Sequence, residues 1–258
     1  NLISQLTHAV ERSEFKLAFQ PKVDAKTERV MGLEALIRWV PEGDVPEQSR
    51  SPSVFIPLAE RRGLIASITK WTVHELISHV NTLVKSNFKG HLSINLSAEL
   101  LVDSMTVEKI FEPLTLFASE DIIFDVEITE TAYANIKPEI VDYLNGLTDK
   151  GITLSIDDFG TGYSSLSMLR NLNSSFVKID KEFVDELHCN EDDYAIVAAT
   201  ISMAHKLGKK VIAEGVEMQE QIDCLKALNC DFLQGFYYAK PMFVDELVDY
   251  LKSQNDSF

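Results

Sequence analysis

The sequence is poor in cysteine and lacks long apolar runs, and both shortages narrow the class of protein. Its three cysteines, Cys189, Cys224 and Cys230, form neither a paired disulfide framework nor a CxxC motif, which is typical of thiols in a reducing compartment. No apolar run approaches the ~20 residues that span a bilayer, and no signal peptide opens the chain. We expect a cytoplasmic domain. Because it starts abruptly at Asn1, we expect a longer, even membrane-anchored, protein with regulatory or sensor domains before this segment.

Positive charge is also scarce. Lys and Arg total 24 while Asp and Glu total 40, so the formal net charge is −16. Such a surface repels a polyanion, and no basic stripe is present, which excludes DNA and RNA polymers as partners. Any phosphate chemistry must therefore bring its own positive charge, most simply as a divalent metal ion. By itself, the charge indicates only a soluble protein.

No stretch is rich enough in Pro, Gly and Ser to be a linker between domains. The one candidate, residues 41–52, lies between two segments that belong to the same predicted barrel. We therefore expect residues 1–258 to form a single domain. An α/β barrel is a common way to make one domain of about 250 residues.

Short apolar runs alternate with amphipathic stretches along the chain, which predicts strands alternating with helices and hence a parallel sheet. Eight strands in one domain favour a closed TIM-like (β/α)8 barrel. The first two runs are separated by only residues 24–29, too few for a helical crossover, so the first strand should be antiparallel. The predicted strands are residues 15–23, 30–39, 91–95, 122–128, 152–156, 176–179, 211–213 and 232–233, and the predicted helices are residues 57–62, 65–84, 106–117, 138–150, 192–207, 218–228 and 244–252.

Polar side chains lie at the ends of seven consecutive predicted strands. In a parallel barrel these ends meet at one rim, where barrel enzymes keep their active sites. A single acid at a strand end is usually a helix cap or a solvated turn, but seven such strands are hard to explain that way. The residues are Glu34 and Arg38, Asn95, Glu127 and Glu130, Asp157 and Asp158, Lys178 and Asp180, Glu214, and Gln234.

Several of these side chains offer hard oxygen donors without thiolate or imidazole. Oxygen-only sites suit Mg²⁺ or Mn²⁺ better than Zn²⁺. Converging carboxylates repel one another unless cations lie between them. Adjacent Asp residues can bridge two metal ions, an arrangement that holds both the attacking and the leaving oxygen of a phosphodiester. The candidate donors are Glu34, Asn95, Glu127, Asp157 and Asp158.

The segment Glu34–Arg38, EALIR, resembles the name-giving motif of the EAL-domain family, which comprises cyclic di-GMP phosphodiesterases and their non-catalytic relatives. The likeness covers nearly the whole chain, in family order, through FQPKVD, FIPLAERRGLI, INLS, EITET, DDFGTGYSSL, VKID, AEGVE and QGFYYAKPM. These nine motifs identify the chain as a member of the family. The resemblance implies an eight-stranded barrel whose first strand is antiparallel.

The resemblance also implies two Mg²⁺ or Mn²⁺ ions per active site. Ca²⁺, which prefers longer bonds and more ligands, is expected to bind and inhibit. Catalytic roles fall to Glu34, Lys178 and Glu214, with Lys178 orienting the attacking water and helping to deprotonate it. One ion is held by Glu34, Asn95, Glu127 and Asp157, and the other by Asp157 and Asp158, with Glu214 bound directly or through water.

Further family positions match residues around this metal site. Glu130 would fix the loop of residues 158–166, and Glu217 would support the ligands from behind. The predicted substrate-binding residues are Gln20, Leu36, Arg38, Asp180, Gln234 and Pro241, and the loop residues are Phe159, Gly160, Thr161 and Gly162.

The function implied is hydrolysis of cyclic di-GMP to linear 5′-pGpG by a water activated by two metal ions, in a homodimer. The main alternative is a catalytically silent receptor that binds cyclic di-GMP without cleaving it. A third reading, a generic metal-dependent nuclease, is disfavoured by the net charge of −16.

Two departures from the family pattern carry their own expectations. Lys22 replaces a more usual apolar residue, which puts the substrate edge in some doubt. Residues 173–175 replace a Pro and an acid, and they should lie at the opposite end of the barrel. We expect that second departure to affect stability or dimer contacts rather than chemistry.

Overall fold

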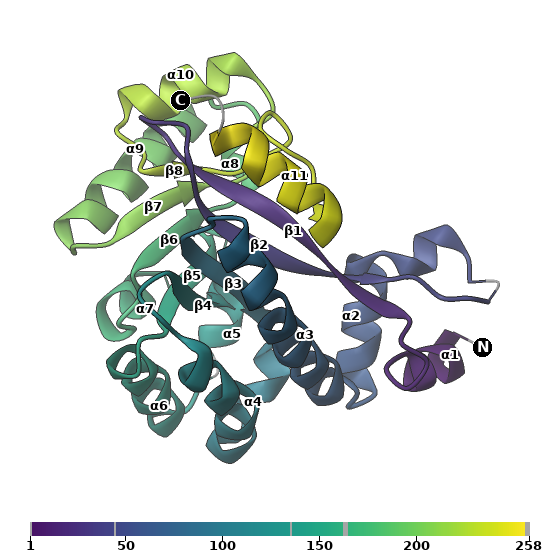
Figure 1. Cartoon of the computed structure of the whole chain (residues 1–258). Helices are drawn as coiled ribbons and strands as arrows, with labels where there is room; N and C mark the ends of the chain where they lie inside the picture. Colours follow the sequence, from purple (N-terminus) through teal and green to yellow (C-terminus); the bar gives the residue numbers. More distant parts are fainter. Residues whose placement is uncertain (1, 44, 135, 162–164, 256–258) are drawn as a thin grey trace.

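Eight strands close into a barrel, and helices cover its outside (Figure 1). The structure is a computed structural model that describes residues 2–43, 45–134, 136–161 and 165–255. Neighbouring strands pair in chain order from β2 to β8, and β1 closes the ring by pairing with both β2 and β8. The strands are β1 (Phe15–Asp24), β2 (Val30–Trp39), β3 (Gly90–Leu96), β4 (Ile122–Thr129), β5 (Thr153–Phe159), β6 (Phe176–Ile179), β7 (Lys210–Ala213) and β8 (Phe232–Leu233), and the short strand β9 (Met242–Phe243) pairs with β1 on the edge that faces β8.

Strand β1 runs against its neighbours, as the short first connection predicted. Its first residue, Phe15, pairs with Trp39 at the end of β2. The reversal is made by a tight turn in which Asp24 Oδ1 accepts hydrogen bonds from the backbone N–H of Lys26 (2.9 Å) and Thr27 (2.7 Å), a common use of Asp in turns. Because of this reversal, β1 begins at the rim where β2 to β8 end.

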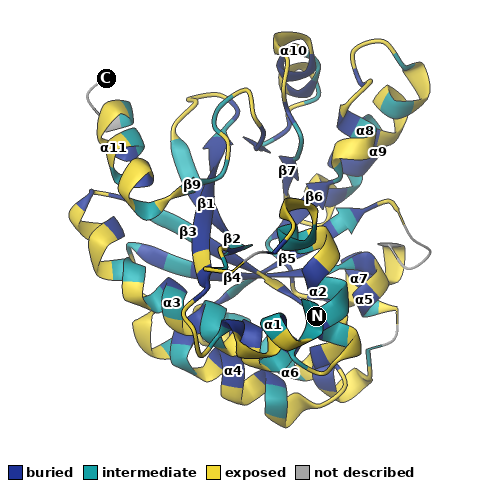
Figure 2. Ribbon diagram, turned by 90° about the vertical axis from the view of Figure 1, so that its right-hand side faces the viewer, coloured by how far each residue is buried: buried dark blue, intermediate teal, exposed yellow. Residues whose placement is uncertain are grey.

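The helices pack their apolar faces against the outside of the barrel, where the main core lies. Figure 2 shows buried strands surrounded by helices whose outer faces are exposed. The elements are α1 (Leu2–Ala9), η1 (Glu47–Arg50), α2 (Pro52–Arg61), α3 (Ile65–Lys85), η2 (Ala98–Leu100), α4 (Ser104–Phe117), α5 (Glu130–Tyr133), α6 (Pro138–Asp149), α7 (Ser165–Asn171), α8 (Lys181–Val184), α9 (Glu191–Lys206), α10 (Gln219–Ala227) and α11 (Val244–Asn255).

The inside of the barrel has two chemically different halves below the rim. On β6, β7 and β8, Phe176, Ile212 and Phe232 form a small separate apolar cluster, the usual content of such a barrel. On β1, β3, β4 and β5 the inward positions at the same depth are polar: Lys22, Ser93, Asp125 and Ser155, all buried. Each of the strands β3 to β8 then places a polar residue two positions further on, on the same face, at the rim.

The predicted start of one helix is wrong. We expected a helix from residue 57, whereas α2 begins at Pro52, where proline is well tolerated as the first helical residue. Pro57 lies inside the helix. Burial of Phe55 and Ala59 holds this segment against the core despite the proline. The preceding residues form η1, and Val45 is buried in the main core.

In the described part of the chain, no helix combines the length and the apolar character that crossing a membrane requires.

Candidate functional site

Four carboxylates surround the ammonium group of Lys178 at the carboxyl-terminal rim. Lys178 is 1% exposed, and it extends from β6 into the barrel. Its Nζ lies 2.5 Å from Glu127 Oε2, 2.7 Å from Glu214 Oε1, 3.1 Å from Asp157 Oδ1 and 3.5 Å from Glu34 Oε2. These residues come from β2, β4, β5 and the end of β7. The structure therefore brings together acids that lie up to 180 positions apart in the sequence.

Amide side chains fix the orientation of Glu34. Asn95 Nδ2 donates to Glu34 Oε1 (2.8 Å), and Gln234 Nε2 donates to Glu34 Oε2 (2.7 Å). Gln234 Nε2 also lies 3.2 Å from Gln20 Oε1, on the strand position that pairs with Glu34. Gln234 Oε1 is buried and has no partner among the described residues, so it remains available to a donor.

A bulge in β5 brings two consecutive aspartates to the same site. Successive side chains of a strand normally point to opposite faces, which would separate Asp157 from Asp158. Here the pairing of β5 with β6 shifts register between Ile156 and Phe159, and Asp158 has φ 53°. This left-handed conformation is uncommon outside glycine, and Asp and Asn tolerate it best. As a result, carboxylate oxygens of Asp157, Asp158 and Glu214 lie within 4.8 Å of one another.

Burial and neighbouring charges shift the pKa values of these groups in different directions. Burial alone would raise the pKa of Glu34, but Lys178, Lys22 and two hydrogen bonds lower it to about 2. Burial and the neighbouring charge of Glu34 raise the pKa of Glu127 to about 7. Burial and Asp157 raise the pKa of Asp158 to about 6. Burial would lower the pKa of Lys178, but the surrounding carboxylates raise it well above its usual value, so this lysine is charged.

The donor set fits hard divalent cations. Its atoms are carboxylate and carboxamide oxygens, the ligands that Mg²⁺ and Mn²⁺ prefer. Five carboxylates share the site with only two buried ammonium groups, so additional positive charge would stabilise it. The carboxylates are Glu34, Glu127, Asp157, Asp158 and Glu214, and the ammonium groups belong to Lys22 and Lys178.

Pockets open on both sides of Leu36 at the rim. One, of about 680 Å³, is lined by Leu36, Arg38, Asn95 and Asp158 together with residues of α2 and α3. The other, of about 240 Å³, is lined by residues that include Leu36, Gln20, Glu34, Glu214 and Gln234. Glu34 and Glu214 thus line the smaller space and Asp158 lines the larger one.

Arg38 and Pro241 share a third pocket, of about 440 Å³. Arg38 is half-buried, and its Nη1 donates to the carbonyl oxygen of Ile37 (2.9 Å). Burial lowers the pKa of Arg38, but a guanidinium stays charged at neutral pH. Its remaining donors can meet a phosphate at the rim.

Glu130 contacts the first residues of the loop that follows β5. The buried carboxylate of Glu130 accepts a hydrogen bond from the backbone N–H of Gly160 (3.2 Å). Gly160 has φ 100°, and a side chain there would press against Phe183. Phe159 is buried, and Thr161 Oγ1 donates to the carbonyl oxygen of Asp158 (2.8 Å). Gly162 lies outside the described residues.

Two predicted residues lie beside the cluster rather than in it. Asp180 caps α8 by accepting from the backbone N–H of Glu182 (2.7 Å), and its proximity contributes to the raised pKa of Asp158. Glu217 is exposed and pairs with Lys181 (2.6 Å). Lys181 lines the smaller pocket beside Glu214, and sequence reasoning missed it because it belongs to none of the recognised motifs.

The expectation for Lys22 is wrong. Its side chain does not reach the substrate edge. It lies inside the barrel, 1% exposed, with Nζ 2.5 Å from Glu127 Oε1. The sequence held one signal that could have found it, since Lys22 lies two residues after Gln20 on the inward face of the same strand.

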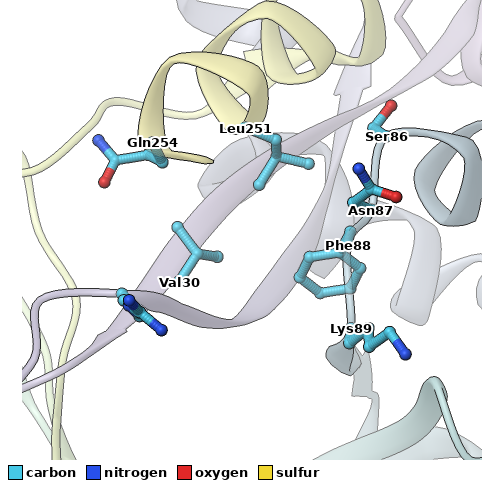
Figure 3. A pocket seen from close by; sticks show the side chains of 8 residues that line it. Val30, Ser86, Asn87, Phe88, Lys89, Leu251 and Gln254 are labelled. Atoms are coloured by element: carbon cyan, nitrogen blue, oxygen red, sulfur yellow. The ribbon is translucent and has the colours of Figure 1, made fainter. Parts of the chain in front are cut away.

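The opposite end of the barrel holds the second departure and a separate pocket. Asn173 Nδ2 donates to Thr148 Oγ1 (2.9 Å), and Lys209 Nζ donates to Ser174 Oγ (2.9 Å); the segment precedes β6, at the end we expected. A pocket of about 310 Å³ lies at the start of β2 and β3, and Figure 3 shows its apolar side chains facing a row of residues that leads into β3. It contains no carboxylate, and its lining is Arg29, Val30, Ser86, Asn87, Phe88, Lys89, Leu251 and Gln254.

Comparisons with known proteins agree with the fold. Residues 3–241 match the family described as EAL domain. The chain is 35% identical over 249 residues to the bifunctional diguanylate cyclase/cyclic di-GMP phosphodiesterase MucR of Pseudomonas aeruginosa, covering 96% of this chain and 36% of MucR. It is 33% identical over 251 residues to the probable cyclic di-GMP phosphodiesterase PdeG of Escherichia coli, covering 96% and 49%.

Solved structures give the same result. The PaMucR phosphodiesterase in complex with c-di-GMP superposes with a TM-score of 0.84 at 35% identity, covering 95% of this chain and 99% of that one. The EAL enzyme Bd1971, solved with cAMP and cyclic di-GMP, gives a TM-score of 0.85 at 30% identity, covering 97% and 68%. The chain spans about a third to a half of the length of the curated relatives named above.

Proposed function

The chain belongs to the EAL domain family, and from this premise we propose that it hydrolyses cyclic di-GMP to linear 5′-pGpG with the help of two divalent metal ions. The observation that carries the proposal is the cluster of carboxylates around Lys178 at the barrel rim, with pockets on both sides. The net charge of −16 supports a small substrate over long nucleic acids.

Mg²⁺ or Mn²⁺ would be held by the oxygen donors of the cluster. When bound, such ions supply the charge that lowers the pKa of a water and stabilises the phosphate in in-line attack. One ion would take Glu34, Asn95, Glu127 and Asp157, and the other Asp157, Asp158 and Glu214.

The protein's own side chains would orient the substrate and manage the proton. The Lys178 ammonium, charged and buried among the acids, can hold a proton at Nζ beside the reacting phosphate. Arg38 offers its remaining guanidinium donors to phosphate oxygens. Leu36, between the pockets, would separate the two halves of the substrate. Gln20 and Gln234 would keep Glu34 in place, and Gln234 Oε1 would accept a donor from the ligand.

The experiment that tests this function must separate an enzyme from a receptor. The purified chain is incubated with cyclic di-GMP in the presence and absence of Mg²⁺, and the products are resolved by chromatography. We expect 5′-pGpG only when Mg²⁺ is present. Tight binding of cyclic di-GMP, measured by calorimetry, without product in either Mg²⁺ or Mn²⁺ would identify a silent receptor and refute the proposal.

We also propose that the active form is a cytoplasmic homodimer and that regulatory or sensor domains in a longer protein control the activity of this domain. The greater length of MucR and PdeG supports the second part. Size-exclusion chromatography with light scattering tests the dimer, and a monomer at assay concentration would contradict it.

A further inference from the structure

A buried lysine ties the metal-site ligand Glu127 to the polar layer beneath the rim. Lys22 Nζ lies 2.5 Å from Glu127 Oε1 and donates to Ser93 Oγ at 2.7 Å. Ser93 Oγ in turn donates to Asp125 Oδ2 at 2.9 Å. All four residues are 1% exposed. The hydrogen bonds therefore run in one direction, from the ammonium group through the hydroxyl to a second carboxylate.

The two oxygens of Glu127 meet different partners. Oε1 faces down the barrel and is taken by Lys22, whereas Oε2 faces the rim and contacts Lys178. With Oε1 held, the carboxylate plane cannot rotate without breaking a buried ion pair. Oε2 is therefore the oxygen of Glu127 that faces the carboxylate cluster at the rim.

A charged layer at this depth is costly to build. Burying a lysine loses its hydration, and only close partners offset that loss. In the other half of the same barrel the interior is filled by Phe176, Ile212 and Phe232. Apolar side chains at this depth are therefore compatible with this fold. Asp125 is itself held by hydroxyl groups, those of Ser93 and Ser155 on Oδ2 and that of Thr153 on Oδ1. Hydrogen bonds thus connect the polar side chains of this half to one another, and through Lys22 to Glu127.

We propose that Lys22 is a positioning residue for the metal site: together with Ser93 and Asp125 it holds Glu127 so that Oε2 is presented to the ion. The inference rests on the proposed metal-dependent function. Groups that hold a metal ligand from behind commonly change metal affinity 10–100-fold when removed. Lys22 acts through Glu127 and is too deeply buried to touch the substrate.

The test uses Lys22→Met, which keeps the length of the side chain but removes its charge and donors. It also uses a matched pair, Ser93→Ala and Ser155→Ala. Both serines are buried and donate to the same oxygen of Asp125, at 2.9 and 2.7 Å. Of the two, only Ser93 accepts from Lys22. Mn²⁺ affinity is measured by calorimetry without substrate, and kcat and KM are measured at saturating Mn²⁺.

We expect the Kd for Mn²⁺ to rise at least tenfold in Lys22→Met and several-fold in Ser93→Ala, with less than a twofold change in Ser155→Ala. We expect kcat to fall in the same order while KM for cyclic di-GMP changes less than twofold. Removing a cation makes the site more negative, which by itself would tighten Mn²⁺ binding. Weaker binding therefore reports lost orientation rather than lost charge.

Unchanged or tighter Mn²⁺ binding in a folded Lys22→Met protein would overturn the inference. If Lys22→Met does not fold, equal Mn²⁺ affinities in the two serine variants would overturn it instead. Failure of the wild-type chain to cleave cyclic di-GMP would refute only the proposed function, because Mn²⁺ affinity is measured without turnover.

Discussion

At the scale of single residues, Lys178 is the most heavily constrained side chain of the site, with four carboxylates around one buried ammonium group. We expect Lys178→Ala to lower turnover by roughly two to four orders of magnitude, the usual range for a proton-transferring group. Affinity for cyclic di-GMP, measured by calorimetry in Ca²⁺, should change little, because Arg38 and the bound ions would meet the phosphates. Loss of turnover and affinity together would count against this role.

The same substitution should destabilise the metal-free protein. Removing one partner of a buried ion pair costs about 3–5 kcal/mol, and here several carboxylates lose their shared cation. Urea unfolding with and without Mg²⁺ checks this expectation. Mg²⁺ should restore much of the lost stability in Lys178→Ala, and an identical loss in both conditions would show that the lysine and the ion do not share the same acids.

A substitution of Glu34, one of the proposed metal ligands, tests the metal-site assignment independently of Lys178. Its carboxylate is held by Asn95 and Gln234 and has a pKa lowered to about 2, so it is an anion at any working pH. Glu34→Gln keeps the shape and removes the charge. We expect hydrolysis to fall at least ~100-fold, metal affinity to weaken and the melting temperature to stay within a few degrees. Glu108→Gln, at an exposed acid on α4, is the control.

Metal affinity should depend on pH. In the metal-free protein the pKa of Glu127 is raised to about 7 and that of Asp158 to about 6, so both acids hold protons below these values. An ion must displace those protons, and affinity should therefore fall as pH falls, by about tenfold per unit for each displaced proton. Calorimetric titrations between pH 5.5 and 8 measure the slope. A flat profile would mean that neither acid binds the ion.

At the scale of elements, the bulge in β5 explains how adjacent aspartates reach one site. Asn shares with Asp a tolerance of positive φ, whereas Ala at such a position costs roughly 1–2 kcal/mol. We expect Asp158→Asn to melt close to the wild type and Asp158→Ala to melt lower, with both losing hydrolysis. Thermal melts and the product assay check this. Equal melting of the two variants would argue that φ 53° carries no strain.

Element boundaries show where sequence reasoning works. β2, β6 and β8 were predicted to the residue, because apolar runs between turn residues identify buried strands well. The bulge could not be predicted, since Asp157 and Asp158 follow an apolar run that has no signal for a change of register. The start of α2 was misplaced because Pro57 suggested a beginning, while the burial of Phe55 that overrides it is a tertiary contact.

At the scale of the whole molecule, the rim acids were predictable because parallel strands end at the same face. The polar half of the barrel interior was not. Lys22 and Glu127 are separated by 105 positions, and their contact depends on how β1, reversed in direction, is registered against β2. The spacing of Lys22 from Gln20 indicates an inward side chain, but it does not say which residue of another strand the ammonium group meets.

The melting temperature of the whole fold should rise with any divalent cation that binds the site, whether or not that cation supports hydrolysis. A ligand that binds only the folded state raises the melting temperature by mass action. We expect both Mg²⁺ and Ca²⁺ to raise it, whereas only Mg²⁺ should yield 5′-pGpG, since Ca²⁺ prefers longer bonds and more ligands. Equal turnover with Ca²⁺ as the sole divalent ion would contradict the proposed two-ion arrangement.

Because β1 runs in the reverse direction, the first and last helices lie at different ends of the barrel, and this determines through which helix the protein can be attached to a surface. Because Phe15 pairs with Trp39 at the rim, α1 lies at the rim end of the barrel, near α2 (Figure 1). The last turn of α11 instead lines the pocket at the far end, through Leu251 and Gln254. A surface linker joined through α1 would crowd the entrance, whereas one joined through α11 would leave it open to an immobilised assay.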